Sequence, residues 1–331
     1  MTRPSTQMTT SATTEGAHEK DAQIVVVALT YGQGDEVAGL LSHLCTETIT
    51  ATNELIVVHN PSRPNEALSL SPSSDVRVVE LATNSGYVGG MNAGIEIALR
   101  SSPEFVLLLT HDVRITANDV QRLRTLMCDN PDIGAIGPVL CRSDNVPYSA
   151  GFVRHNRIRM QHRLPTGEMP RPIWPCAALD GSAMMWRAAA LEEVQGFDKR
   201  FFMYFDDVDI CTRATRCGWQ IAVATDLRAI SAPGGTHRRS AHAYLRARNG
   251  LAYAHTFGLT GLLSGLAECA VGLWQATPKP GGQRFRDMEA RQIAASYWRG
   301  TLLGVVDYFR GRWGPPPPTM SRDSDIAATS M

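Results

Sequence analysis

The sequence predicts an α/β fold with a doubly wound, mainly parallel β-sheet, followed by carboxy-terminal helices. Short β-branched runs alternate with segments of helical spacing over residues 23–140, and from Ser240 to about Arg312 the pattern is helical throughout. The short runs are apolar at nearly every position, which is typical of strands buried on both faces. Strands that alternate with helices indicate parallel pairing through right-handed crossovers.

Five runs in the amino-terminal half have the composition of buried strands: Gln23–Thr30, Glu54–His59, Val76–Leu81, Glu104–Thr110 and Ile133–Val139. Three intervening segments have helical spacing: Glu36–Cys45, Met91–Arg100 and Ala117–Asp129. Ligands of such sheets bind beyond the carboxyl ends of the strands. The candidate binding residues at these ends are therefore Thr30, Tyr31, His59, Asn60, His111 and Asp112.

The second half is less regular. Between Asn145 and Cys176 it is rich in Arg, His and Pro, which predicts a long hairpin or a flexible loop, and such loops often act as functional lids. Another apolar stretch lies at Ala183–Trp186. Short strands are expected at Gln220–Ala224 and Ala229–Ser231, after which a Gly-rich loop leads to His237.

Composition narrows the class of protein. The 331 residues suffice for one large domain or two small ones. A formal net charge of zero gives no basic field for nucleic acid, and seven cysteines without a CxxC motif favour a reducing compartment. Residues 1–22 have no apolar core of a signal peptide, and no apolar run reaches the roughly 18 residues of a spanning helix. We therefore expect a cytoplasmic protein with disordered tails at 1–22 and 314–331.

An acidic stretch follows an aromatic one. The apolar residues Phe201–Phe205 lead directly into Asp206, Asp207 and Asp209. Carboxylates in the first turn of a helix gain from its dipole, and the apolar lead-in predicts that they are held at the edge of a cleft. Asp209 and Arg213 are spaced as a helical ion pair, and Gly218 should end the helix. The alternative is an acidic first turn with a solvated ion pair.

A Gly-rich stretch, Asn84–Gly94, precedes the second expected helix. Glycines allow a backbone to approach a diphosphate, and a helix N-terminus attracts anions, although a simple turn before a helix explains the glycines equally well. The loop follows the third strand and lacks GxGxxG spacing, which disfavours a nicotinamide-dependent oxidoreductase. Asp112, at a strand end, is placed either to hold a divalent cation that bridges phosphates or to form a turn.

Taken together, these residues resemble the family-2 glycosyltransferases of the GT-A fold, and within them the bacterial rhamnosyltransferase branch. The resemblance covers about residues 23–257 and is most specific over Gly181–Arg213, where Gly196-Phe197-Asp198 leads into the acidic stretch. The Asn84–Gly94 loop matches the family's N-x-G…N-x-G loop. The dipeptide Arg248-Asn249 is similar to an Arg-Asn pair that recurs in this branch.

The resemblance implies a catalytic domain over residues 23–240, with a nucleotide-sugar half to about 140 and an acceptor half from 141, and a helical extension over 241–313. It implies that Asp207 is the general base, that Asp206 assists it, and that Asp112 and His237 hold Mg²⁺ or Mn²⁺. It places Gly181, Asp209 and Arg213 on the acceptor side. It implies that the donor is bound by Thr30, Tyr31, His59, Asn60, Asn84, Gly86, Gly89, Asn92, His111 and Asp112.

The implied activity is an inverting, metal-dependent transfer of a sugar, rhamnose in this branch, from a nucleoside diphosphate to a saccharide, lipid-linked or small-molecule acceptor. His59 stands where the family usually has an Asp that contacts the base, and Thr110 stands where a strict DxD motif begins. These departures keep open a catalytically degenerate protein that binds a nucleotide sugar or a partner. The segments Gly258–Gln275 and Tyr297–Trp313 combine Leu, Val and Trp with Arg, which predicts a packed or dimerising subdomain or a face at the inner membrane surface.

Overall fold

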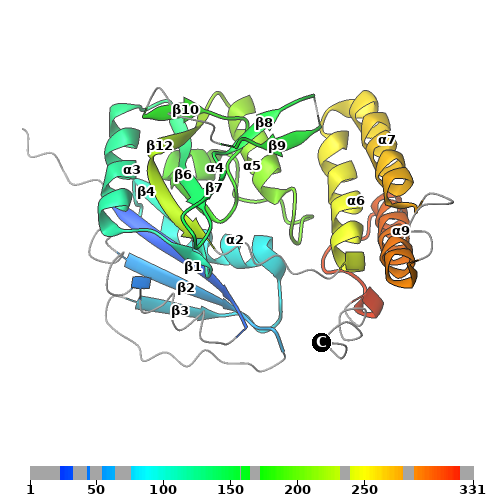
Figure 1. Cartoon of the computed structure of the whole chain (residues 1–331). Helices are drawn as coiled ribbons and strands as arrows, with labels where there is room; N and C mark the ends of the chain where they lie inside the picture. The colour runs from blue at the N-terminus through cyan, green and yellow to red at the C-terminus, as the bar shows by residue number, and fades with distance from the viewer. Residues whose placement is uncertain are drawn as a thin grey trace, which may run out of the picture.

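A computed structural model describes residues 23–32, 43–44, 54–63, 76–156, 158–164, 172–231, 239–278 and 287–320. Most of the helix expected at Glu36–Cys45, the histidine His237 and the tail 1–22 lie outside this part of the chain. Figure 1 shows a central sheet covered by helices, with three long helices standing beside it. The predicted α/β architecture is confirmed, and the sheet is mixed.

One half of the sheet is parallel, as predicted. It contains β1 (Ile24–Tyr31), β2 (Glu54–Asn60), β3 (Val76–Glu80) and β4 (Phe105–Thr110) in the order β4-β1-β2-β3. The apolar runs of β1, β2 and β4 are buried at almost every position, because layers cover both faces of the sheet.

The other half contains antiparallel pairs. The strand β11 (Ala183–Arg187) lies antiparallel between β4 and β6 (Ile133–Cys141). Next to β6 is β12 (Gln220–Ser231), one long strand with an irregular register between Ala224 and Arg228, where two short strands were expected. Because β11 runs against β4, the start of β11 lies beside the carboxyl end of β4.

The stretch expected to be irregular carries four short strands. They are β7 (Pro147–Ser149), β8 (Phe152–Arg154), β9 (Met160–His162) and β10 (Ile173–Pro175). The strands β8 and β9 form a separate hairpin, whereas β7, β10 and the two-residue β5 (Val113–Arg114) extend the main sheet.

Helices cover both faces of the sheet. On one face lie α2 (Gly86–Leu99), α4 (Ala188–Glu193) and α5 (Asp206–Arg216), and on the other lies α3 (Ala117–Asp129). The helix α2 begins at Gly86, five residues before the expected start. A Cβ atom on Gly90 or Gly94 would overlap the side chains of Leu29 or Val27, so these two glycines let α2 pack closely on β1.

The described residues of the carboxy-terminal part form a helical layer that contains α6 (Arg239–His255), α7 (Gly258–Ala276) and α9 (Met288–Phe309). In Figure 1, α6 lies nearest the sheet and α7 and α9 lie farther out. The chain then returns to the core through the short helix η3 (Pro318–Met320), and Met320 is fully buried beside Phe202. The tail expected to be disordered from Gly314 is therefore packed as far as Met320, because one large apolar side chain anchors it.

Candidate active site

The acidic stretch forms a strained turn followed by a helix. The helix α5 begins at Asp206, and Gly218 adopts a positive φ of 100° just after its end, as predicted. Directly before α5, Tyr204 and Phe205 have left-handed φ angles of 72° and 66°. Each such non-glycine residue costs about 1–3 kcal/mol and persists only where its surroundings enforce it. The backbone that presents the carboxylates is therefore held by its neighbours.

The aromatic residues that precede α5 provide part of the contacts that enforce this backbone conformation. Phe201 and Phe202 are 1% and 8% exposed, and Met203, Tyr204 and Phe205 are half-buried, so the first two residues of the apolar run are buried as the sequence predicts. The ring of Phe205 lies 5.9 Å from the ring of Tyr253 in α6 and also contacts Gly250. The turn is thus enclosed between the sheet domain and α6.

Two carboxylates share this enclosed position. Asp206 is 5% exposed, and Asp207 is half-buried, with the N–H of Val208 donating to its Oδ1 at 2.8 Å. Burial raises the pKa of Asp206 to about 7, and nearby Asp209 and Asp180 add to the rise. Burial also raises the pKa of Asp207 well above its ordinary range, with Asp206 and Asp180 adding repulsion. A carboxylate with a raised pKa in a cleft is suited to accepting a proton near neutral pH.

Asp180 and Tyr148 belong to the same site, although the sequence did not single them out. Asp180 Oδ1 accepts hydrogen bonds from the N–H and the hydroxyl of Ser182 at 2.9 and 2.6 Å. The hydroxyl of Tyr148 interacts with Ser182 and Ser231, and burial next to Asp180 raises the pKa of Tyr148 to about 12. The place of Asp180 directly before Gly181 was a usable signal, whereas the irregular segment around Tyr148 offered none.

A third carboxylate, Asp112, lies just past the end of β4. The hydroxyl of Thr110 donates to its Oδ1 at 2.5 Å, and the hydroxyl of Ser231 donates to its Oδ2 at 3.2 Å. The N–H of Thr110 in turn donates to the carbonyl of Ser182 at 3.0 Å. This bond joins the end of β4 to the turn before β11.

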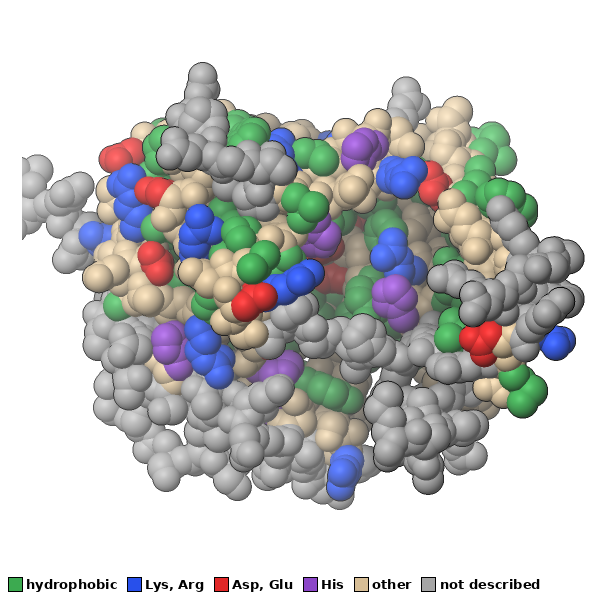
Figure 2. Space-filling view, viewed as in Figure 1, with side chains coloured by type: hydrophobic (Ala, Val, Ile, Leu, Met, Phe, Trp, Pro, Cys, Tyr) green, Lys and Arg blue, Asp and Glu red, His purple; other side chains and the backbone are tan. Residues whose placement is uncertain are grey.

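Gly181 in that turn connects the two acidic sites. A Cβ atom on Gly181 would lie 3.1 Å from the hydroxyl of Tyr87 and 3.7 Å from Cβ of Asp207. The Tyr87 hydroxyl donates to the carbonyl of Gly181 at 2.7 Å. The turn at Gly181 and Ser182 thus contacts both Asp207 and the end of β4, which brings Asp207 and Asp112 to the same edge of the sheet. Figure 2 shows the surface hollowed between the strand-rich part and the helices, with acidic side chains deep in the hollow.

The site fits a divalent cation only if a bound ligand supplies some of the coordinating oxygens. Among the described residues, no three His, Cys, Asp or Glu side chains are grouped closely enough to hold a metal ion. Mg²⁺ commonly binds through one or two carboxylates together with phosphate oxygens of a ligand. Asp112, oriented by two hydroxyls, matches that pattern, while His237 lies outside the described residues.

The Asn84–Gly94 loop makes contacts within the protein. Asn60 Nδ2 donates to Asn84 Oδ1 and to the carbonyl of Gly86, both at 3.1 Å, and Asn60 Oδ1 accepts from the N–H of Ser85 at 2.9 Å. The N–H of Val88, in the first turn of α2, donates to the carbonyl of Phe202 at 3.4 Å. Much of the loop expected to meet a diphosphate thus joins β2 and the segment before α5.

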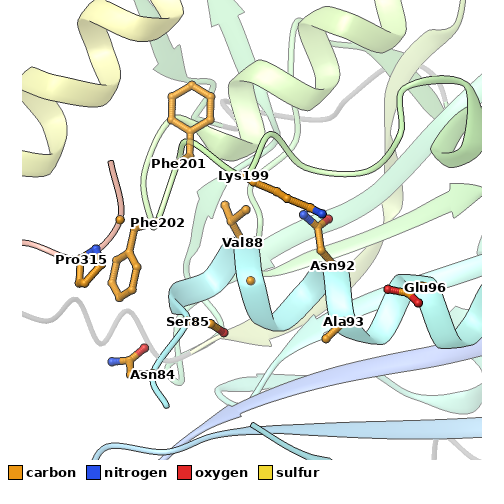
Figure 3. A pocket seen from close by; sticks show the side chains of 12 residues that line it. Asn84, Ser85, Val88, Asn92, Ala93, Glu96, Lys199, Phe201, Phe202 and Pro315 are labelled. Atoms are coloured by element: carbon orange, nitrogen blue, oxygen red, sulfur yellow. The ribbon is translucent and has the colours of Figure 1, made fainter. Parts of the chain in front are cut away.

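Gly89 and Asn92 face a separate pocket. Asn92 exchanges two hydrogen bonds of 2.9 Å with the backbone of Phe197, so its amide is committed within the protein. The pocket, of about 400 Å³, lies along α2 (Figure 3). By helical spacing Tyr87 points to the opposite side of α2, so this pocket is not the acidic cleft. It is lined by Asn84, Ser85, Val88, Gly89, Asn92, Ala93, Glu96, Lys199, Phe201, Phe202, Gly314 and Pro315.

The remaining candidate residues also fall into two groups: some are buried and bonded within the protein, and others are half-buried at the strand ends. Thr30 and His59 are fully buried and pair through Oγ1 and Nδ1 at 3.2 Å, and His59 Nε2 has no hydrogen-bond partner among the described residues. Tyr31 and His111 are half-buried at the strand ends. On α5, Arg213 pairs with Asp209 at 2.7 Å and donates to the carbonyls of Val194 and Gly196. That pair fastens α5 to the loop after α4.

The fold and the acidic cleft together define a GT-A glycosyltransferase. The structure matches GalNAc-T7, solved with UDP, GalNAc and Mn²⁺, at a TM-score of 0.55 and 10% identity, over 89% of this chain and 59% of that chain. It matches a mannosyltransferase from Pyrobaculum calidifontis, solved with GDP-Man and Mn²⁺, at a TM-score of 0.51 and 14% identity, over 87% of each chain. At these identities the likeness shows the fold.

Residues 51–253 match the family described as glycosyltransferase like family 2, and the chain belongs to that family. An N-acetylglucosaminyl-diphospho-decaprenol L-rhamnosyltransferase of Mycobacterium tuberculosis is 26% identical over 217 residues, which are 59% of this chain and 71% of that protein. A low-salt glycan biosynthesis hexosyltransferase of Haloferax volcanii is 26% identical over 201 residues, 59% of this chain and 62% of that protein. The predicted family is confirmed, and with it glycosyltransferase activity.

Proposed function

We propose that the protein is an inverting glycosyltransferase that moves a sugar from a nucleoside diphosphate to an acceptor hydroxyl. The observation that carries the proposal is Asp207, a half-buried carboxylate at the same edge of the sheet as Asp112. Its pKa is raised by burial and by the charges of Asp206 and Asp180, which strengthens Asp207 as a proton acceptor.

In this reaction Asp207 takes the proton of the acceptor hydroxyl while that oxygen attacks the anomeric carbon. The new C–O bond forms on the face opposite the diphosphate, the bond to the diphosphate breaks, and the configuration inverts. Asp206, a buried neighbour in the same turn, supplies negative charge that strengthens Asp207 as a base. Gly181 leaves room beside Asp207, because a Cβ atom there would crowd the Tyr87 hydroxyl at 3.1 Å and touch Cβ of Asp207 at 3.7 Å.

Asp112 is the residue we propose for a divalent cation, Mg²⁺ or Mn²⁺, with His237 as a second ligand. Thr110 and Ser231 orient its carboxylate by donating to both oxygens. When bound, such a cation would neutralise the departing diphosphate. The donor then extends towards the ends of β1 and β2, where Tyr31 and His59 lie. The Mycobacterium tuberculosis relative, an L-rhamnosyltransferase, makes a rhamnose nucleotide the first donor to test.

The acceptor side includes an apolar surface on α7 and α9. Of the large hydrophobic side chains that are exposed in the described part of the chain, all but Val146 and Leu164 lie there: Leu259, Leu263, Val271, Trp274, Met288, Trp298, Leu302, Leu303, Val306 and Phe309. No described helix is both long and apolar enough to cross a membrane. The residues instead form faces along two helices, which suits contact with a surface.

Charge favours an anionic lipid surface over a second copy of the chain. On α9, Arg299 is exposed on the same side as Leu302 and Val306 by helical spacing. The acidic residue described between Trp298 and Phe309, Asp307, is buried. A two-fold contact through this face would bring Arg299 of one copy towards Arg299 of the other, whereas acidic headgroups would neutralise it. A membrane contact also suits a lipid-linked acceptor.

A panel of nucleotide sugars tests the proposed activity. The donor should raise the melting temperature of the protein in the presence of Mg²⁺ or Mn²⁺, because a ligand that binds only the native state stabilises it. Transfer to saccharide and lipid-linked acceptors should follow, with inverted anomeric configuration by NMR. Retention of configuration would refute the mechanism, and binding without transfer would favour the degenerate binder.

Vesicle sedimentation tests the membrane contact. With vesicles of about one-third anionic lipid, a Leu263→Gln, Leu302→Gln double variant should partition about 10-fold less than the parent, because each exposed leucine loses apolar contact. Leu164→Gln is the matched control, since Leu164 is 61% exposed and lies outside α7 and α9. Equal sedimentation of all three proteins, or a dimer in ultracentrifugation that only the double variant abolishes, would refute the lipid assignment.

A further inference from the structure

A buried asparagine of α6 holds the backbone of the acidic turn. Asn249 is fully buried, and its Nδ2 donates to the carbonyls of Met203 and Tyr204 at 2.8 and 3.1 Å. These carbonyls belong to the turn before α5, in which Tyr204 and Phe205 have left-handed φ angles. Both N–H groups of one amide are thus used on the strained backbone directly before Asp206.

We propose that Asn249 is a positioning residue that sets the place of Asp207 in the cleft through this turn. The inference rests on the proposed role of Asp207 as base, and it adds the residue that fixes the position of this base. A strained turn relaxes unless contacts enforce it. The two bonds from Asn249 are such contacts, and they come from outside the segment of the turn, since α6 begins more than 30 residues after it.

The orientation of the Asn249 amide is itself fixed. Its Oδ1 accepts from Arg248 Nε at 3.0 Å, so its NH₂ group is the end that faces the turn. Arg248 NH1 donates to the Tyr244 hydroxyl at 3.2 Å, and that hydroxyl donates to Asp307 Oδ2 of α9 at 3.0 Å. All four side chains are buried.

This chain of bonds connects the outer helix α9 to the catalytic turn. A buried guanidinium is costly to desolvate, so its placement is tied to the groups that pair with it. Connected buried polar groups also restrict each other's geometry. The helical layer therefore contributes to the active site, and α6 is functionally part of the catalytic domain, although the sequence assigned it to an extension.

Two substitutions separate positioning from general packing. Asn249→Ala removes both donors, and Asn249→Asp keeps the shape and the acceptor for Arg248 but presents oxygens to the two carbonyls. We expect kcat to fall about 10–100-fold in both, because small displacements of a reacting group have effects of that size. The donor KM should change by less than about threefold, since the donor residues are untouched.

The matched control is Asn130→Ala. Asn130 Nδ2 donates to the carbonyl of Leu126 at 2.8 Å, at the end of α3, so its removal also deletes an amide–carbonyl bond. This variant should keep the parent kcat. If both Asn249 variants keep it as well, or if kcat falls equally in Asn130→Ala, positioning is refuted.

Hydrogen exchange supplies a readout that needs no activity. Backbone amides in peptides over residues 201–212 should exchange about 10-fold faster in both Asn249 variants, while peptides from α2 and β4 remain unchanged. If the parent protein transfers no sugar, the proposed function is refuted, but hydrogen exchange still tests whether Asn249 positions the turn. Unchanged exchange at 201–212, or faster exchange throughout the chain, would overturn the inference. If both Asn249 variants fail to fold, Asp307→Asn at the far end of the chain decides, with a smaller local increase expected.

Discussion

The cleft contains two acidic sites of different construction. At the turn before α5, Asp206 and Asp207 lie in an enclosed position, where Asp207 accepts a hydrogen bond from the backbone N–H of Val208. At the end of β4, Asp112 is held by the hydroxyls of Thr110 and Ser231. The first site raises the pKa of its carboxylates through burial and mutual repulsion.

The difference separates two kinds of chemistry. Enclosed carboxylates that repel one another gain affinity for a proton, which is what a base requires. A carboxylate oriented by neutral hydroxyls keeps its charge available to a cation, and such orienting partners tune a metal ligand. We therefore propose that the turn transfers the proton and that the strand end binds the cation, and each proposal can be tested separately.

The largest effect is expected at Asp207. Asp207→Asn keeps the shape of the side chain but cannot accept a proton, so transfer should fall roughly 10²–10⁴-fold while donor binding stays near that of the parent. Calorimetric donor titration and initial rates measure the two quantities. Asp226→Asn, a change at a surface carboxylate paired with Arg122, serves as the control. Parent-like turnover of Asp207→Asn would move the base to Asp206.

A smaller effect is expected at Asp112. Asp112→Asn should weaken the binding of a nucleoside diphosphate by about 10–100-fold when Mn²⁺ is present, because one charged ligand is lost. Chelator should weaken binding to the parent by a similar factor and have little further effect on the variant. An undiminished response of the variant to chelator would place the cation elsewhere.

The sequence predicted the parallel half of the fold and the acidic turn well, because both follow local rules. Apolar runs such as β1 identify strands buried on both faces, and an aromatic lead-in to acidic residues indicated the buried start of α5. The direction of β11 was not predictable, since a short apolar run reads the same for either direction of pairing. That reversal is what brings Gly181 and Ser182 beside the end of β4.

Residues with several possible reasons for their identity were the least predictable. Gly90 and Gly94 fit a phosphate loop in sequence, but in the structure they allow close packing of α2 on β1. Asn92 resembled a ligand contact and instead binds the backbone of Phe197. Asn249 lies more than 40 positions from the turn it contacts, and only the packing of α6 reveals that link.

The smallest expected effect concerns stability and distinguishes the two carboxylates of the turn. Burial raises the pKa of Asp206 to about 7, above the value of about 4 in an unfolded chain. The folded state therefore binds the proton more tightly, and the stability gained is fully present below about pH 4 and is lost as pH rises through about 7.

Asparagine stays neutral at every pH. Asp206→Asn should thus be more stable than the parent by about 1–2 kcal/mol at pH 8.5, and this advantage should shrink towards pH 4. Urea unfolding at the two pH values measures the difference, with Asp226→Asn, a change at a surface carboxylate, as the control. A constant offset between Asp206→Asn and the parent would mean that the pKa of Asp206 is the same in the folded and the unfolded chain, which would refute the burial of its charge in the turn.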